Sequence, residues 1–194
     1  MSLADRVRHP AFLERVMSAE EAAALIPAGA NVGMSGFTGA GHPKAVPQAL
    51  AAHAKAEHAA GKPYKINLWT GASTAPELDG ALAAANALGQ RLLFNTDPIC
   101  RNKINTGEID FIDMHLSHVA QHAWFGFLGP LHVAVIEVLG VTADGLLIPA
   151  AAVGNNKTWL EIADQVILEV NNKPSAKIEG MHDIYYGTAI PPRT

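Results

Sequence analysis

The sequence predicts an α/β fold, in which an open and mostly parallel sheet carries helices on both faces. Short apolar runs alternate along the chain with longer segments of helical pattern, which is the element order of a parallel sheet. One run, residues 132–139, is almost continuously apolar, as a strand covered on both faces should be. Several of the loops between a strand and the next helix are rich in glycine or hydroxyl side chains.

The first predicted elements lead into a glycine-rich loop. Ser18 and Glu21 fit a capping box, which opens a helix over residues 19–26. Residues 30–34 have the pattern of a strand, and the alanine-rich residues 44–60 that of a helix.

The same order of strand, loop and helix then recurs. We expect further strands at residues 65–69, 91–94, 110–114, 132–139, 146–148 and 165–170. We expect the intervening helices at residues 76–88, 99–105, 117–127 and 159–163. The pattern weakens from about Asn171, and the final Pro191-Pro192 is typical of a linker.

Composition limits the class of protein. The chain has 194 residues, enough for one domain that buries roughly 70% of its unfolded surface. Hydrophobic residues make up 49% and charged residues 16%, with a net charge of −4, which argues for a globular core and against disorder or nucleic-acid binding. The first ten residues carry charges where a signal peptide needs an apolar core, and no run of 18 apolar residues occurs. We therefore expect a cytoplasmic protein without membrane contact.

The segment from Gly33 to Lys44 is the most informative part of the sequence, because it places four glycines between a strand and a helix start. Such a loop can bring backbone N–H groups close to an anion. Its glycine spacing matches neither the dinucleotide-binding fingerprint nor the P-loop. Two interpretations remain, an anion-binding loop and a tight strand-to-helix turn.

Loops that follow parallel strands gather at one edge of the sheet. The glycine loop, residues 70–74 and Asn95-Thr96 all occupy such positions, so we expect them to lie together and to line a crevice. Ser73 and Thr96 carry hydroxyls suited to orienting a carboxylate or a carbonyl oxygen. The alternative for both hydroxyls is local loop capping.

Other reactive side chains each have a structural alternative. His115, His118 and His122 could share one helix face, but no acidic residue completes a metal site there, so we expect surface or interface histidines and no metal. Glu137 and Glu169 interrupt apolar strands, where they could be nucleophiles or bases, or could be salt-bridged or capping.

Two further features carry little chemistry. Cys100, the single cysteine, has no nameable partner base and is a weak nucleophile candidate. The aromatic cluster at residues 124–128 is more typical of a core, or of a packing surface for another domain, than of a ring-stacking site.

Six segments together resemble the acetyl-CoA hydrolase/transferase family of class I CoA-transferases, and within it the succinyl-CoA:acetate CoA-transferases. They span nearly the whole chain in the expected order and comprise residues 33–44, 70–74, 94–96, 115–120, 135–137 and 153–158. The resemblance implies two related α/β domains with the active site between them, of which this chain matches the first. Residues 1–190 would form that domain, and residues 191–194 would begin the linker to a second.

The resemblance also implies the chemistry. The family moves CoA from an acyl-CoA to a free carboxylate through a glutamyl-CoA thioester, and the reactive glutamate belongs to the second domain. CoA is then a substrate and no separate cofactor is expected. The implied partners are acyl-CoA and short carboxylate substrates, the C-terminal domain and further copies in a homo-oligomer. An apolar face left without that domain would also make the chain prone to self-association.

What the resemblance assigns to this chain is substrate binding rather than catalysis. Ser73 and Thr96 match hydroxyl positions that face the substrate, and residues 35–37 match a segment that lines the same cleft. The predicted substrate-binding residues are Ser35, Gly36, Phe37, Gly39, Ser73, Asn95 and Thr96. Glu137 and Glu169 match positions that are not the nucleophile. Two alternative functions remain, a stand-alone CoA- or carboxylate-binding module and an acetyl-CoA hydrolase.

Overall fold

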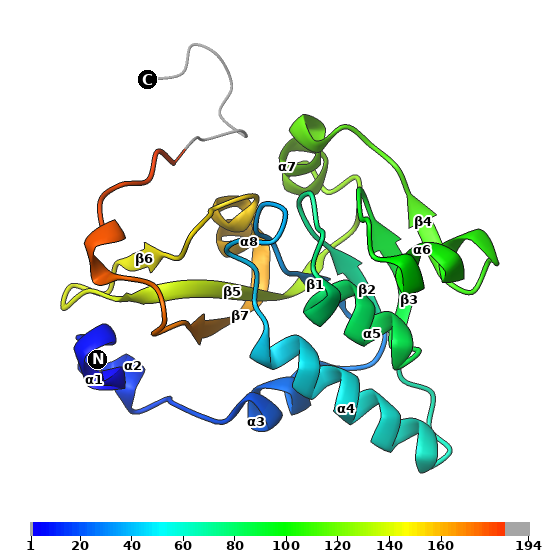
Figure 1. Cartoon of the computed structure of the whole chain (residues 1–194), viewed down its shortest axis with the longest axis horizontal. Coiled ribbons are helices and arrows are strands. Elements are labelled where there is room, and N and C mark those ends of the chain that lie inside the picture. Colours follow the sequence, from blue (N-terminus) through cyan, green and yellow to red (C-terminus); the bar gives the residue numbers. More distant parts are fainter. Residues whose placement is uncertain (1, 185–194) are drawn as a thin grey trace.

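A computed structural model describes residues 2–184 and shows a seven-stranded, mostly parallel sheet (Figure 1). The strand order is β4-β3-β2-β1-β5-β6, and β7 pairs with β5. Only β6 runs antiparallel to its neighbour. The strands are β1 Asn31–Gly33, β2 Ile66–Trp69, β3 Leu88–Leu92, β4 Asp110–Ile112, β5 Leu131–Val141, β6 Leu147–Pro149 and β7 Ala163–Val170.

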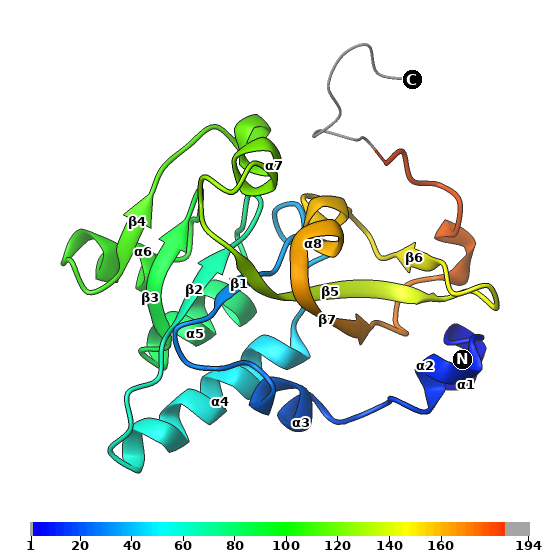
Figure 2. The same ribbon diagram turned by 180° about the vertical axis from the view of Figure 1, so that it is seen from behind.

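Helices cover both faces of this sheet (Figures 1 and 2). The α-helices are α1 Leu3–Arg6, α2 Pro10–Leu13, α3 Ala19–Ala24, α4 Ala45–Ala59, α5 Ala81–Ala84, α6 Pro98–Asn105, α7 Leu116–Trp124 and α8 Asn156–Ile162. A short π-helix, η1, spans Pro76–Gly80, and a 3₁₀-helix, η2, spans Ala176–Ile178. The predicted fold class is therefore confirmed. Residues 191–194, predicted to begin a linker, lie outside the described residues.

Two separate cores lie on the two faces because side chains alternate along each strand. In β5, Val133 and Val135 pack into the core beneath α3 to α6, and Ala134 and Ile136 into the core beneath α7 and α8. The near-continuous apolar run of this strand thus has the predicted cause. Among the described helices, none is long and apolar enough to cross a bilayer.

Several predicted boundaries differ from the structure by a few residues, and two of the differences have a clear backbone cause. The strand expected at residues 91–94 is β3, which begins at Leu88 and ends before Leu93, because Leu93 has a left-handed backbone with φ +58°. The single helix expected over residues 76–88 is instead η1 followed by α5, and Asn86 at φ +55° lies in the turn that leads into β3. The capping box was predicted correctly, since Ser18 Oγ accepts from the Glu21 N–H at 3.1 Å.

The described ends of the chain are clasped to one another. The buried Arg6 donates through Nη2 to the backbone carbonyls of Asn172 and Pro174, and Arg8 pairs with Glu179 at 3.1 Å. A backbone bridge also joins Val7 to Val141 at the end of β5. The first helical turn therefore packs against the segment that follows β7.

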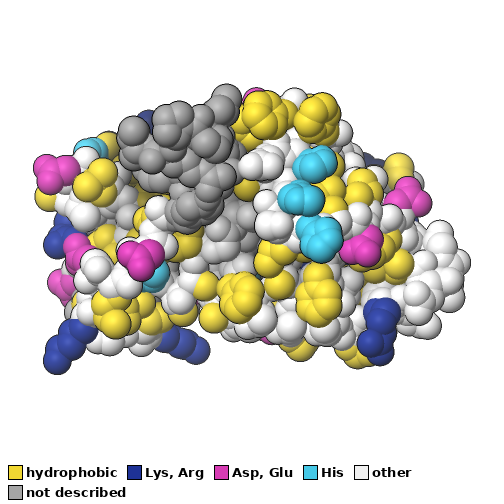
Figure 3. Space-filling model, turned by 90° about the horizontal axis from the view of Figure 1, so that it is seen from above, with side chains coloured by type: hydrophobic (Ala, Val, Ile, Leu, Met, Phe, Trp, Pro, Cys, Tyr) yellow, Lys and Arg dark blue, Asp and Glu magenta, His cyan; other side chains and the backbone are white. Residues whose placement is uncertain are grey.

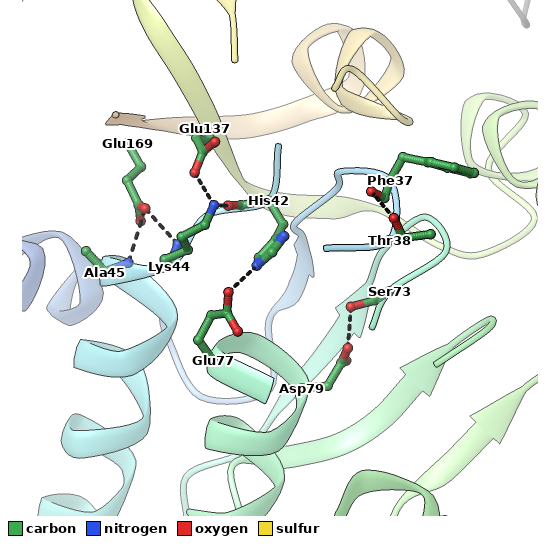
Figure 4. Close-up of polar contacts among 10 residues, drawn as sticks. All are labelled: Phe37, Thr38, His42, Lys44, Ala45, Ser73, Glu77, Asp79, Glu137 and Glu169. Carbon is green, nitrogen blue, oxygen red and sulfur yellow. Dashed lines mark hydrogen bonds and ion pairs between the residues drawn. The ribbon is translucent and has the colours of Figure 1, made fainter. Parts of the chain in front are cut away.

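Two strand carboxylates hold the start of α4 (Figure 4). Glu169 of β7 accepts from the backbone N–H groups of Lys44, Ala45 and Val46 at 2.6, 3.1 and 2.9 Å. Glu137 of β5 is buried and pairs with Lys44 Nζ at 2.5 Å. These contacts support the capping alternative for Glu169 and the salt-bridge alternative for Glu137, because both carboxylates already have structural partners.

We predict that Glu169→Ala lowers the free energy of unfolding by about 2–4 kcal/mol, because three helix N-terminal donors lose a charged acceptor. Urea denaturation monitored by circular dichroism measures this change. Glu14→Ala, which removes an exposed carboxylate, is the matched control and should be neutral within about 0.5 kcal/mol. Equal effects of the two variants would contradict the capping role.

Candidate functional site

Three loops that follow parallel strands meet at one edge of the sheet, as the sequence predicted. The Thr38 N–H donates to the Ala72 carbonyl at 2.7 Å, and the Ser73 N–H donates to the Phe94 carbonyl at 3.1 Å. The Thr96 N–H donates back to the Ser73 carbonyl at 3.3 Å. The loops after β1, β2 and β3 thus form one continuous hydrogen-bonded surface beside α7 and α8 (Figure 1).

A fourth loop joins them through close backbone packing. The Asn155 N–H donates to the buried Ser35 Oγ at 2.8 Å. A Cβ on Gly41 would lie 2.6 Å from the Ala152 backbone nitrogen, and one on Gly154 would lie 2.6 Å from the Gly36 carbonyl oxygen. Both glycines also have positive φ, so no other residue fits without strain. We call residues 35–41, 71–74, 94–96 and 152–155 the rim.

The glycine loop itself ends in a tight turn. Phe37 and Ala40 exchange backbone hydrogen bonds at 2.9 and 3.1 Å, and the Thr38 hydroxyl donates to the Phe37 carbonyl at 2.8 Å (Figure 4). These contacts give the loop the tight-turn geometry that was one of its two interpretations. The exposed tip of the turn carries Phe37, which is 54% exposed, together with Thr38 and Gly39.

The predicted substrate-binding residues fall into two groups. Phe37, Gly39 and Thr96 are exposed on the rim, and Asn95 is half-buried. Ser35, Gly36 and Ser73 are buried beneath them. The structure therefore brings all seven residues together, whereas their binding of substrate stays a prediction.

A buried ion pair that the sequence pattern did not predict lies directly beneath the rim. Asp79 of η1 and Arg91 of β3 are fully buried, with Arg91 Nε donating to Asp79 Oδ1 at 2.7 Å. The second carboxylate oxygen of Asp79 accepts from the Ser73 hydroxyl (Figure 4). An arginine directly before the apolar run Leu92-Leu93-Phe94 was the signal that could have found this pair, because a buried guanidinium needs a partner.

A second polar cluster holds the other end of the glycine loop. Buried His42 contacts Glu77 Oε1 of η1 through Nε2 at 3.0 Å, and Lys44 Nζ donates to the His42 carbonyl at 2.7 Å (Figure 4). Burial raises the pKa of Glu77, but its own backbone N–H, the hydrogen bond from His42 and the charges of His42 and Lys44 together lower that pKa below its ordinary value. The folded protein therefore favours the ionised form of the Glu77 carboxylate.

The histidines of α7 lie in a row on the surface. The His115 and His118 rings are 5.4 Å apart and the His118 and His122 rings 6.1 Å apart, and Figure 3 shows histidine side chains flanked by apolar ones. No group of three or more metal-ligating side chains that could hold an ion occurs within residues 2–184. His115 and His118 are exposed and His122 is half-buried, which supports the surface interpretation of these histidines.

The structure also shows how Cys100 and the aromatic cluster at residues 124–128 are placed. Cys100 is a fully buried residue of α6, and burial raises the pKa of its thiol to about 12, which makes it a poor nucleophile. Trp124, Phe125 and Phe127 at the end of α7 are 41%, 55% and 76% exposed, so they form a surface rather than a core.

Comparison with known proteins gives a family match and close sequence relatives. The model of the acetyl-CoA hydrolase/transferase N-terminal domain matches residues 1–189. The chain is 40% identical to the succinyl-CoA:acetate CoA-transferase of Clostridium kluyveri over 93% of its own length and 33% of that protein. It is 36% identical to the acetyl-CoA hydrolase of Yarrowia lipolytica over 94% of its length and 36% of that protein. The chain thus spans about a third of the length of these curated relatives.

The fold also has known structural counterparts. Glutaconate coenzyme A-transferase from Acidaminococcus fermentans aligns with a TM-score of 0.59 at 12% identity, over 79% of this chain and 68% of that one. At such low identity the alignment supports the fold alone.

We predict that Glu77→Gln destabilises the protein near neutral pH and loses this effect in acid. The lowered pKa of Glu77 means that its charge stabilises the folded state fully above the unfolded carboxyl pKa of about 4.3, and that this contribution disappears as pH falls through the folded value. Urea midpoints of both proteins at pH 7 and pH 3.5 measure the difference. A gap that is equal at the two pH values would contradict the role given to the charge.

Proposed function

The chain belongs to the acetyl-CoA hydrolase/transferase family, and we propose that its rim binds substrate in the transfer of CoA between a short-chain acyl-CoA and a carboxylate. The name of the relative from Clostridium kluyveri suggests succinyl-CoA as the donor and acetate as the acceptor. The family match supports an enzyme of this general class.

The observation that carries this proposal is the composition of the rim. Its residues offer hydroxyls, amides and backbone N–H groups, but they include no Asp, Glu, His, Lys or Cys. Such groups can position a carboxylate or stabilise charge on a thioester oxygen. A hydroxyl becomes a nucleophile only when a base activates it, and none of the rim residues supplies that base. The rim is therefore suited to one wall of a site whose reactive group comes from elsewhere.

The carboxylates nearest to the rim have other roles. Asp79 is paired with Arg91, and Asp97 caps α6 by accepting from the Cys100 N–H at 2.9 Å. Glu137 and Glu169 hold the start of α4. In our proposal the glutamate that forms the glutamyl-CoA thioester lies in a second domain, because the matched relatives are about three times as long as the aligned segment.

The exposed aromatic end of α7 fits this arrangement. Leu116 at the start of α7 lies beside the rim, since its Cδ1 would be 3.9 Å from a Cβ added to Gly71. Trp124, Phe125 and Phe127 are exposed at the other end of the helix. Exposed groups of large apolar side chains are typical of interfaces, and we propose that the second domain packs here and closes the rim into a cleft.

A hydrolase remains the second candidate, because relatives such as that of Yarrowia lipolytica are named acetyl-CoA hydrolases. The two reactions share the acyl-CoA donor and differ in the acceptor, which is a carboxylate in one and water in the other. A stand-alone binding module differs from both, since it would bind CoA or carboxylates tightly without turnover.

We predict that the 194-residue chain forms no acetyl-CoA from succinyl-CoA and acetate, whereas the chain extended by a second domain of the family does. In the extended protein, Thr96→Val should lower kcat/KM for the carboxylate acceptor about tenfold, the effect of one lost hydrogen bond to a charged group. Thr106→Val, at the far end of α6, is the matched control.

Three outcomes would change this conclusion. Turnover by the short chain would contradict the assignment of the nucleophile to a second domain. Free CoA released at equal rates with and without acetate would favour the hydrolase. Micromolar affinity of the short chain for CoA in calorimetry, with no turnover in the extended protein, would favour the binding module.

A further inference from the structure

We propose that the buried Asp79–Arg91 pair fixes the hydrogen-bonding polarity of the two predicted rim hydroxyls, so that Ser73 acts only as an acceptor toward a ligand and Thr96, of the two, is the donor. Asp79 and Arg91 are then positioning residues, which act through the side chain and the loops that they hold. This inference rests on the proposed function only in assuming that the rim binds a substrate.

The Ser73 hydroxyl donates its hydrogen bond to Asp79. A serine hydroxyl has one proton to donate, and an ionised carboxylate can only accept. Asp79 is fully buried and paired with the Arg91 guanidinium, so its second oxygen accepts the Ser73 proton. The Ser73 oxygen keeps its lone pairs but has no proton left for a ligand.

The same ion pair also fixes the backbone conformation of the loop that follows β3. Arg91 Nη1 donates to the carbonyls of Leu92 and Leu93, the latter at 3.3 Å, and Nη2 approaches the Phe94 carbonyl at 3.5 Å. These contacts hold Leu93 in its left-handed conformation, which a leucine adopts only under constraint. The turn at Leu93 directs residues 94–96 onto the rim, where the Phe94 carbonyl also accepts from the Ser73 N–H.

Thr96 differs from Ser73 because its hydroxyl proton is not used by another described side chain. Its side chain is exposed, and its hydroxyl has no partner among the described residues. The two rim hydroxyls that sequence reasoning treats as equivalent therefore differ in polarity. Thr96 can donate to the oxygen of an ionised carboxylate, whereas Ser73 matches only a ligand group that brings its own N–H or O–H, such as an amide or a protonated carboxyl.

The test reverses the polarity without removing the contacts. In Asp79→Asn, the amide oxygen can still accept from Arg91 Nε, while the amide N–H₂ donates to Ser73 and frees the serine proton for the rim. Asp97→Asn is the matched control, because Asp97 is a buried carboxylate of the same region that contacts no rim hydroxyl and Asn also caps helices.

We expect NMR of the 194-residue chain labelled at serine to show a Ser73 hydroxyl proton that exchanges at least about tenfold more slowly than those of exposed serines. Ser73→Ala assigns the signal. The slow exchange should persist in Asp97→Asn and disappear in Asp79→Asn. A fast-exchanging Ser73 proton in the wild-type chain would overturn the inference, even if Asp79→Asn does not fold.

Titration with acetate then tests the consequence for ligands, using the amide signals of Gly39 and Thr96. We expect Thr96→Val to weaken acetate binding about tenfold, and Asp79→Asn to strengthen it because Ser73 becomes a second donor. Weaker binding in a folded Asp79→Asn would contradict the polarity assignment. Absence of acetate binding by every variant would count against the proposed function, while the hydroxyl exchange would still decide the polarity.

Discussion

The structure of the rim depends on one buried charge, the guanidinium of Arg91. A charge removed from water is costly unless its donors are satisfied, and here one carboxylate and three consecutive carbonyls surround it. Those acceptors belong to the π-helix η1 and to the end of β3 with the loop that follows it. Satisfying the charge therefore fixes both segments at once. The shape of the rim thus depends on these contacts of Arg91.

A second set of charged contacts fixes the other end of the glycine loop, where α4 begins. Glu137 and Glu169 come from adjacent strands and hold Lys44 and the first backbone donors of α4. The loop between β1 and α4 is therefore anchored at its helical end by charge and along its length by backbone packing. Both anchors lie below the exposed tip, which leaves that tip available for a ligand.

The sequence predicted those features that depend on local pattern. The alternation of elements predicted the sheet, Ser18 and Glu21 predicted a helix start, and the position of loops after strands predicted that Ser73 and Thr96 would lie together. It did not predict the π-helix η1 or the early end of β3. Both depend on the contacts of Arg91 with Asp79 and with the carbonyls of residues 92–94, which the local sequence does not reveal. The burial of Ser73 was missed for the same reason, since its hydroxyl is directed by Asp79 six residues further on.

The clasp between the two described ends of the chain bears on how the protein reaches this structure. Arg6 contacts a carbonyl 166 residues away, so that contact closes a loop of almost the whole domain. The entropy lost in closing a loop rises with its length, and contacts between distant residues are therefore disfavoured until intervening structure brings them near. We infer that the first helical turn docks late in folding, after the parallel sheet has assembled, and that an emerging chain on the ribosome would expose its amino end until β7 is complete.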